Sequence, residues 1–191
     1  KSSKPGFQFP KTVTNKSAFI SWANGIIGKH TTHNTASQLR PGSGKVALIT
    51  GATSGIGKAF AHEYARQGYN LIITGRRKAL IEMAAEQLHD FYGVSVKVII
   101  ADLRSKSDVK RLLTVIGFEE NIEVLVNNAG YGLMKLFHDD ELGNQLEMID
   151  VHVNVPLMII HKVLPAMIEA GRGTVINVSS LAAFLPTHTN M

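Results

Sequence analysis

The stretch that decides the fold is Thr50-Gly51-Ala52-Thr53-Ser54-Gly55-Ile56-Gly57, which lies between an aliphatic run at 46–49 and an apolar-periodic helical pattern. Because glycine has no Cβ, these glycines allow a tight turn and a close approach of the backbone to a ligand. The helix that follows presents free N–H groups and the positive end of its dipole, which attract a pyrophosphate. A plain glycine-rich turn is the alternative, but a strand before and a helix after are typical of dinucleotide binding. We therefore expect the cofactor to contact Gly51, Thr53, Ser54, Gly55, Ile56 and Gly57.

Four further aliphatic runs follow, at 71–73, 96–100, 124–126 and 175–178. They are continuous rather than alternating, as expected of strands that are buried on both faces. Apolar residues recur at three-and-four spacing across 80–91 and 109–116, which predicts helices between the strands. Strands that alternate with helices in this way predict right-handed crossovers and a parallel sheet. The predicted fold class is α/β, a Rossmann-type doubly wound parallel sheet with helices on both faces.

The residues after the second run, Thr74-Gly75-Arg76-Arg77-Lys78, indicate which dinucleotide binds. An NAD site usually has an acidic residue about 20 residues beyond the glycines, and here no acid occurs before Glu82. A carboxylate would repel a 2′-phosphate, whereas a guanidinium can bind one through a forked, charge-assisted pair. If these cations only began a solvated helix, they would lie at the unfavourable end of its dipole. The sequence therefore favours NADP over NAD, with Arg76 and Arg77 as ligands.

The composition is that of an ordinary globular domain, with 45% hydrophobic and 18% charged residues among 191. The chain has no cysteine, which excludes disulfides, thiolate metal sites and cysteine nucleophiles. We predict no metal site. No apolar run in the sequence approaches the roughly 18–20 residues of a membrane-spanning helix, so we do not expect an integral membrane protein.

The net charge of +5 comes from one end of the chain. Residues 1–44 carry six Lys/Arg and no acid, whereas residues 45–191 carry 14 Lys/Arg and 15 Asp/Glu. Proteins that bind nucleic acid usually spread basic residues over a folded face, so we expect no nucleic-acid partner. We predict a basic N-terminal extension at 1–44 and an NADP-binding domain at 45–191. The extension has an apolar cluster around Trp22, which either packs on the domain or forms a targeting or membrane-surface segment. We expect a cytoplasmic protein.

These motifs resemble the short-chain dehydrogenase/reductase family. Residues 50–57 match its Thr-Gly-x-x-x-Gly-x-Gly motif, and residues 127–130 match its Asn-Asn-Ala-Gly motif. Asp102 and Leu103 are similar to the pair that contacts the adenine in the family. The resemblance covers 45–191 with all elements in order, and it implies that the cofactor also contacts Asn128, Ala129 and Gly130.

The resemblance also implies two catalytic residues. Ser180 matches the catalytic serine, which would donate a hydrogen bond to the reacting carbonyl oxygen, where negative charge develops. Asn154 matches the asparagine of the family that has a structural and proton-relay role, holding a water that links a lysine to solvent. Each residue also has a plain structural interpretation: Ser180 as a strand-end hydroxyl, Asn154 as a satisfied core amide and Asp102 as a helix N-cap.

The chain departs from the family at its Tyr-x-x-x-Lys motif, which supplies the general acid/base on the helix after the serine. The sequence reaches Met191 at about the point where that helix should begin. The match from Tyr131 to Lys135 precedes the fifth run, so we interpret it as a coincidence. We expect the last strands of the sheet to be absent as well, so that the chain is either part of a longer protein or an inactive fragment.

The resemblance implies an NADP-dependent carbonyl reductase or alcohol dehydrogenase, which transfers a hydride between NADPH and a small carbonyl or hydroxyl compound. Two alternatives stay open. One is a noncatalytic NADP-binding or scaffold protein of the same fold. The other is a membrane-associated lipid or steroid reductase, which only the cluster around Trp22 indicates. Family members often pair through the helix after Asn154, so we expect a homo-oligomer at full length.

Overall fold

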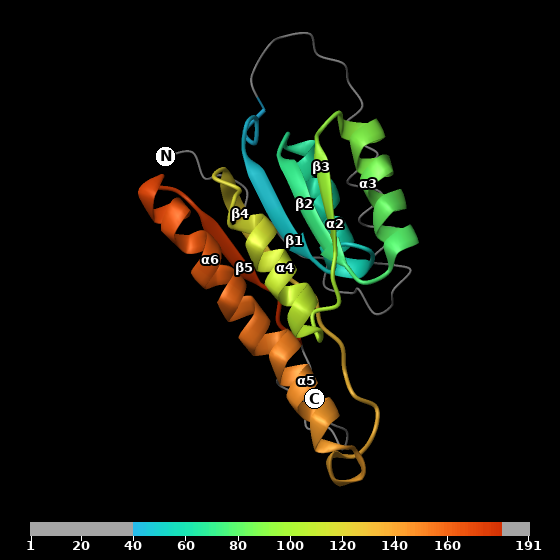
Figure 1. Cartoon of the computed structure of the whole chain (residues 1–191). Helices are drawn as coiled ribbons and strands as arrows, with labels where there is room; N and C mark the ends of the chain where they lie inside the picture. Colours follow the sequence, from blue (N-terminus) through green and yellow to red (C-terminus); the bar gives the residue numbers. More distant parts are fainter. Residues whose placement is uncertain (1–39, 181–191) are drawn as a thin grey trace, which may run out of the picture. The chain divides into compact units, whose positions relative to one another are not determined.

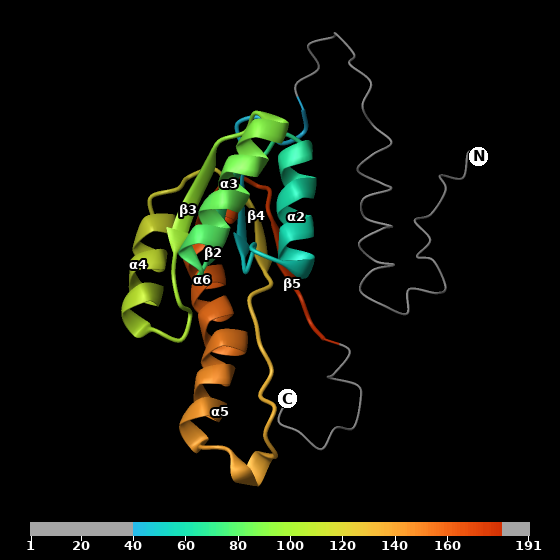
Figure 2. The same cartoon turned by 90° about the vertical axis from the view of Figure 1, so that its right-hand side faces the viewer.

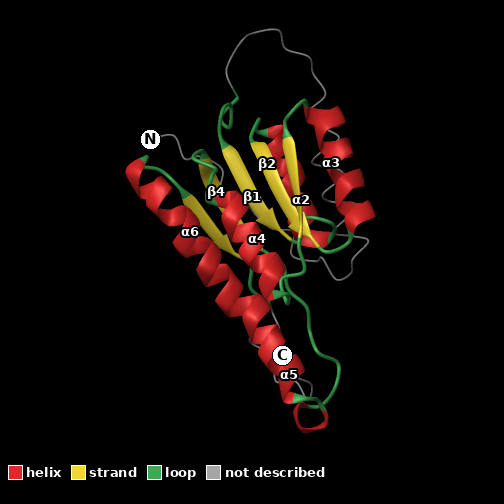
Figure 3. Ribbon diagram, viewed as in Figure 1, coloured by secondary structure: helices red, strands yellow, loops and turns green. Residues whose placement is uncertain are grey.

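Twelve elements follow one another in the computed structural model, which describes residues 40–180 (Figures 1 and 3). Two of them are irregular helices, the short 3-10 helix η1 and the π-helix η2. In chain order they are β1 (Val46–Thr50), α2 (Gly55–Arg66), β2 (Asn70–Gly75), α3 (Lys78–Tyr92), β3 (Val96–Ile100), α4 (Lys106–Ile116), β4 (Ile122–Asn127), η1 (Phe137–Asp139), α5 (Leu142–Ile149), η2 (Asp150–Asn154), α6 (Val155–Glu169) and β5 (Thr174–Asn177). Most of the predicted extension, including the cluster around Trp22, lies outside the described residues.

The five strands form one sheet in the order β3-β2-β1-β4-β5, and every neighbouring pair is parallel. The chain runs outward from β1 to β3 and then returns to the other side of β1 with β4. At such a reversal the connections leave β1 and β4 in opposite directions, which opens a crevice at their carboxyl ends. The predicted doubly wound parallel sheet is confirmed.

Both faces of the sheet are covered, which explains why the strands read as continuous apolar runs. Side chains alternate between the faces of a strand. In β1, Ala47 and Ile49 belong to the core cluster that includes α2 and α3, whereas Leu48 belongs to the cluster that includes α4 and α6. All three are fully buried. Figure 2 shows α2 and α4 on opposite sides of the sheet.

The helices α5, η2 and α6 join without a break into one helical stretch of 28 residues, Leu142–Glu169. By length and composition this stretch could cross a membrane, a possibility that the length of the unbroken apolar runs did not indicate. The sequence conceals it because polar residues such as His152 and Asn154 interrupt the apolar runs. Length and composition do not separate a spanning helix from one that covers a sheet. Here the buried face of α6, including Ile159 and Val163, packs in the core.

Candidate cofactor-binding and active site

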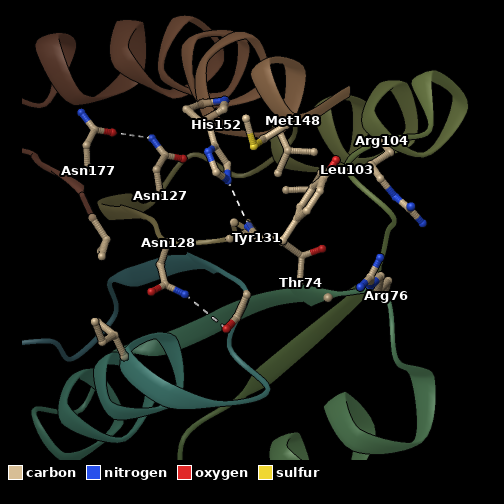
Figure 4. A pocket seen from close by; sticks show the side chains of 18 of the residues that line it. Thr74, Arg76, Leu103, Arg104, Asn127, Asn128, Tyr131, Met148, His152 and Asn177 are labelled. Atoms are coloured by element: carbon tan, nitrogen blue, oxygen red, sulfur yellow. Dashed lines mark hydrogen bonds between the residues drawn. The ribbon is translucent and has the colours of Figure 1, made fainter. Parts of the chain in front are cut away.

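The carboxyl ends of the strands open onto one large cleft (Figure 4). It encloses about 1640 Å³, more than the roughly 300–1,000 Å³ of ordinary small-ligand pockets. An extended ligand therefore has room in it. The cleft is lined by these predicted site residues: Gly51, Thr53, Ser54, Gly55, Ile56, Arg76, Arg77, Asp102, Leu103, Asn128, Ala129, Gly130 and Ser180.

Gly57 does not line the cleft, but it allows the turn between β1 and α2 to close. It is buried, and a Cβ at this position would overlap the carbonyl oxygen of Gly51 and Nδ2 of Asn128. Gly55 has the opposite surroundings: its φ is +57°, and nothing lies within 4 Å of the place where its Cβ would be. One glycine therefore permits close packing inside the turn, and the other leaves open space at the N-terminus of α2.

Thr50 and Asn128 tie this turn to the segment after β4. Oγ1 of Thr50 accepts hydrogen bonds from the backbone N–H groups of Asn128 and Ala129, both at 2.9 Å. In return, Nδ2 of Asn128 donates to the carbonyl oxygens of Thr50 at 3.0 Å and Gly51 at 3.3 Å. The Asn128 side chain therefore joins two loops, which makes its role structural. Thr50 was not among the predicted site residues, and its one signal is a hydroxyl at the last position of a buried strand.

Three guanidinium groups line the cleft near the ends of β2 and β3, and hydrogen bonds to other side chains hold two of them. Nη2 of Arg77 donates to Oγ1 of Thr53 at 3.0 Å, so this side chain reaches across to the glycine turn. Nη2 of Arg104 donates to Oδ2 of Asp102 at 2.6 Å. Among the described residues, Arg76 makes no hydrogen bond or ion pair, although its charge helps to lower the pKa of the Asp102 carboxyl (Figure 4).

Asp102 is ionised, and its partner is an arginine that the sequence interpretation missed. Hydrogen bonds from Arg104 hold the pKa of the Asp102 carboxyl below its usual range. The alternative role as a helix N-cap belongs instead to Ser105, whose Oγ accepts the N–H of Asp108 at 3.3 Å at the start of α4. Arg104 could have been suspected, because parallel neighbours such as β2 and β3 end at the same edge of the sheet.

Tyr131 and His152 lie on another wall of the cleft and contact each other (Figure 4). The backbone N–H of Tyr131 donates to Nε2 of His152 at 3.0 Å. The two rings meet edge to face, with centroids 5.9 Å apart. Burial raises the pKa of the Tyr131 phenol, and the negative charge of Glu147 raises it further, so the phenol is neutral at physiological pH. Neither residue was among the predicted site residues.

The structure does not bring Asn154 to this cleft. Its Nδ2 donates to Oδ1 of Asp150 at 2.6 Å, and it lines a smaller hollow that Val109 and Met158 also line. Residues two apart on a helix point in different directions. Since His152 faces the cleft, Asn154 faces away from it, and the catalytic role of Asn154 stays a prediction.

The Tyr131–Lys135 match does not form a pair either. Nζ of Lys135 lies 3.9 Å from Oδ1 of Asp140, and Lys135 does not line the cleft. The described arrangement agrees with the interpretation of this match as a coincidence of sequence.

Two buried oxygens test whether the cleft fits a polar cofactor. Oγ1 of Thr74 and Oδ1 of Asn127 are buried and have no hydrogen-bond partner among the described residues. Both residues line the cleft, at the ends of β2 and β4. The amide nitrogen of Asn127 is already bound, since Nδ2 donates to Oδ1 of Asn177 at 2.9 Å. Buried polar groups without partners are rare in native proteins, so these oxygens fit a ligand that brings hydrogen-bond donors.

The sequence model of the family described as short chain dehydrogenase matches residues 45–191. The chain therefore belongs to the short-chain dehydrogenase family, whose fold and glycine turn it shares.

Three known proteins illustrate the similarity. A very-long-chain 3-oxoacyl-CoA reductase from Anas platyrhynchos is 38% identical over 156 residues, which cover 78% of this chain and 49% of that protein. Inactive hydroxysteroid dehydrogenase-like protein 1 from Homo sapiens is 31% identical over 146 residues, covering 75% of this chain and 44% of that protein. A short-chain dehydrogenase from Sphingobium yanoikuyae in complex with NADPH has a TM-score of 0.72 at 29% identity, covering 76% of this chain and 57% of that one. The chain spans about half the length of these curated relatives.

Proposed function

We propose that this chain belongs to an NADP-dependent oxidoreductase that transfers a hydride between NADPH and a carbonyl or hydroxyl compound. The observation that carries the proposal is Arg76. It lines the cleft directly after β2 and, among the described residues, has no ion-pair partner, whereas Arg77 and Arg104 are already engaged. The charge of Arg76 acts on Asp102 without a direct ion pair. A guanidinium that no carboxylate pairs directly at this place suits a 2′-phosphate. The NADPH complex of the Sphingobium protein supports the same choice.

Different residues around the cleft would contact different parts of the cofactor. The glycine turn and the N-terminus of α2 would hold the pyrophosphate, because no side chain among the described residues caps that helix end. Asp102 and Leu103 would contact the adenine, and residues 128–130 would lie against the nicotinamide half. When bound, the nicotinamide supplies or accepts the hydride.

Ser180 would act on the substrate at the end of β5. Its hydroxyl would donate a hydrogen bond to the carbonyl oxygen, where negative charge develops during reduction. That oxygen also needs a proton, which a serine does not supply at neutral pH. Among the described residues, Tyr131 is a poor donor because its pKa is raised and Lys135 is bound to Asp140. The family resemblance implies that a Tyr-x-x-x-Lys motif supplies the general acid/base.

The proposal is tested with the natural protein at full length. NADPH and NADH are titrated by cofactor fluorescence, and NADPH oxidation is followed with simple ketones, a ketosteroid and a long-chain 3-oxoacyl thioester. The last two substrates represent the names of the relatives from Homo sapiens and Anas platyrhynchos. We expect NADPH to bind at least tenfold more tightly than NADH, a difference of about 1.4 kcal/mol. Equal affinities would contradict the proposed cofactor.

A noncatalytic NADP-binding protein is the second candidate, because a relative at 31% identity is named inactive. This candidate predicts tight NADPH binding with no turnover of any carbonyl compound in the panel. Turnover of any one of them, lost in a Ser180→Ala variant, would exclude it.

A further inference from the structure

The side chain of His152 lines the cleft and binds the backbone of the segment after β4. Its Nε2 accepts the N–H of Tyr131 at 3.0 Å. A Cβ added to Gly130 would lie 2.8 Å from the same nitrogen, so the imidazole packs directly against the backbone of this segment. Residues 128–131 therefore have two supports: Thr50 and Asn128 at one end and His152 at the other.

The π-helix η2 places His152 there. It interrupts the helical stretch between α5 and α6 for five residues, Asp150–Asn154. A π-turn inserts extra backbone and so changes the direction in which the following side chains point; such turns occur frequently at functional sites. Val151 is buried, His152 faces the cleft and Asn154 turns back to Asp150.

A backbone N–H can only donate, so Nε2 of His152 is the acceptor in this hydrogen bond. The interaction therefore needs an acceptor at this position. An amide oxygen also offers one, whereas an aliphatic side chain does not.

Charges of both signs act on the Tyr131 side of this contact. They belong to Glu147 of α5, Asp102 and Arg104 after β3, and Arg76 after β2. On η2 itself, Asp150 is bound by the amide of Asn154.

We propose that His152 is a positioning residue that holds residues 128–131 in the geometry that binds the cofactor, by accepting the N–H of Tyr131. The inference rests on the proposed cofactor site and adds a residue that acts on the cofactor through the backbone that it holds.

Two substitutions separate the hydrogen bond from the bulk of the side chain. His152→Gln places an amide oxygen near the position of Nε2, whereas His152→Leu removes the acceptor. At pH 7.5 we expect His152→Gln to bind NADPH like the wild type. His152→Leu should bind roughly 2- to 13-fold more weakly, the loss expected for one neutral hydrogen bond. His138→Leu is the control, because His138 is exposed outside the cleft and lies beside Asp139.

Normal binding of NADPH by His152→Leu would overturn the inference. Equally weak binding by His152→Gln and His152→Leu would also overturn it, because a loss of packing alone would lower both affinities. If His152→Leu does not fold, His152→Ala takes its place in the comparison. Failure of the wild type to bind NADPH would instead count against the proposed function.

Discussion

Three arginines that look equivalent in the sequence are given different tasks by their neighbours. Arg104 neutralises Asp102, and Arg77 reaches Thr53 of the glycine turn. Arg76 has no direct ion-pair partner among the described residues, and its charge acts on Asp102 without one. A charged group that already has a partner gains little from a ligand of opposite charge, so Arg76 should contribute most to binding a 2′-phosphate.

Replacing Arg76 with alanine should therefore weaken NADPH binding selectively. The loss of one charge-assisted contact should cost about 1.5–3 kcal/mol of NADPH affinity, while NADH affinity should change little. Both constants are measured by fluorescence titration. Lys78→Ala is the matched control, because Lys78 lies two residues further on, outside the cleft and near Glu82. An equal loss for the two cofactors would count against the assignment.

Ser180 should matter for turnover rather than for cofactor affinity. Ser180→Ala removes a hydrogen bond that strengthens in the transition state, so kcat should fall by roughly 10²-fold or more. NADPH affinity should stay as in the wild type. Ser179→Ala, at the neighbouring cleft residue, is the comparison. The role assigned to Ser180 fails if the two variants turn over at the same rate as the wild type.

Among the elements, the turn from β1 to α2 is the most constrained. Its backbone is held from two sides: by the side chain of Asn128 and by the packing of Gly57 against Gly51. A turn held in this way keeps the N-terminus of α2 directed at the cleft before any ligand binds. This lowers the entropic cost of ordering the turn when the cofactor binds.

Gly57→Ala should disrupt this turn, since its Cβ would overlap Gly51 and Asn128. Overpacking of this kind typically costs about 1–3 kcal/mol of the free energy of unfolding. NADPH binding should weaken as well. Gly143→Ala on α5 is the control, because nothing lies within 4 Å of its Cβ position. It should be neutral or stabilising by up to about 1 kcal/mol, because alanine is the better helix former. Thermal unfolding and NADPH titration of both variants test the contrast.

At the whole-molecule scale, one carboxylate links the segments that precede three strands, at the edge of the sheet opposite the cleft. Glu123 of β4 accepts hydrogen bonds from Nζ of Lys45 at 3.0 Å, from the hydroxyl of Tyr69 at 3.1 Å and from Nε of Arg172 at 2.8 Å. These three residues directly precede or lie close before β1, β2 and β5. Partial burial raises the pKa of Glu123, but the three donors lower it more, so the pKa lies below its usual value.

A carboxyl whose pKa is lowered on folding stabilises the folded state above its unfolded pKa, here about 4.3–4.5, and loses that contribution as the pH falls below it. The melting temperature should therefore decrease from pH 5 toward pH 3, and Glu123→Gln should lose part of this decrease. At pH 7 the variant should be less stable by about 1.5 kcal/mol. Glu86→Gln, at an exposed helix position, is the control. If the melting temperatures of the wild type and of Glu123→Gln fall equally from pH 5 to pH 3, the role of this carboxylate is contradicted.

Much of the fold follows from patterns that are local in the sequence. A strand buried on both faces must be apolar throughout, so 46–49 and 124–126 show themselves as continuous runs. A turn that packs backbone against backbone needs glycine, so the sequence also indicates the position of Gly57. The basic residues after β2 are next to their strand in the chain, and the cleft position of Arg76 follows from that strand alone.

Contacts between distant segments required the tertiary structure. Thr50 is 78 residues from Asn128, and Arg104 reaches the cleft only because β3 lies beside β2. The direction of a helical side chain depends on every turn before it. One π-turn therefore brought His152 to the cleft and left Asn154, two residues later, against Asp150. Residue type and spacing carry no record of that turn, because a π-turn is a property of backbone hydrogen bonding and not of a local residue pattern.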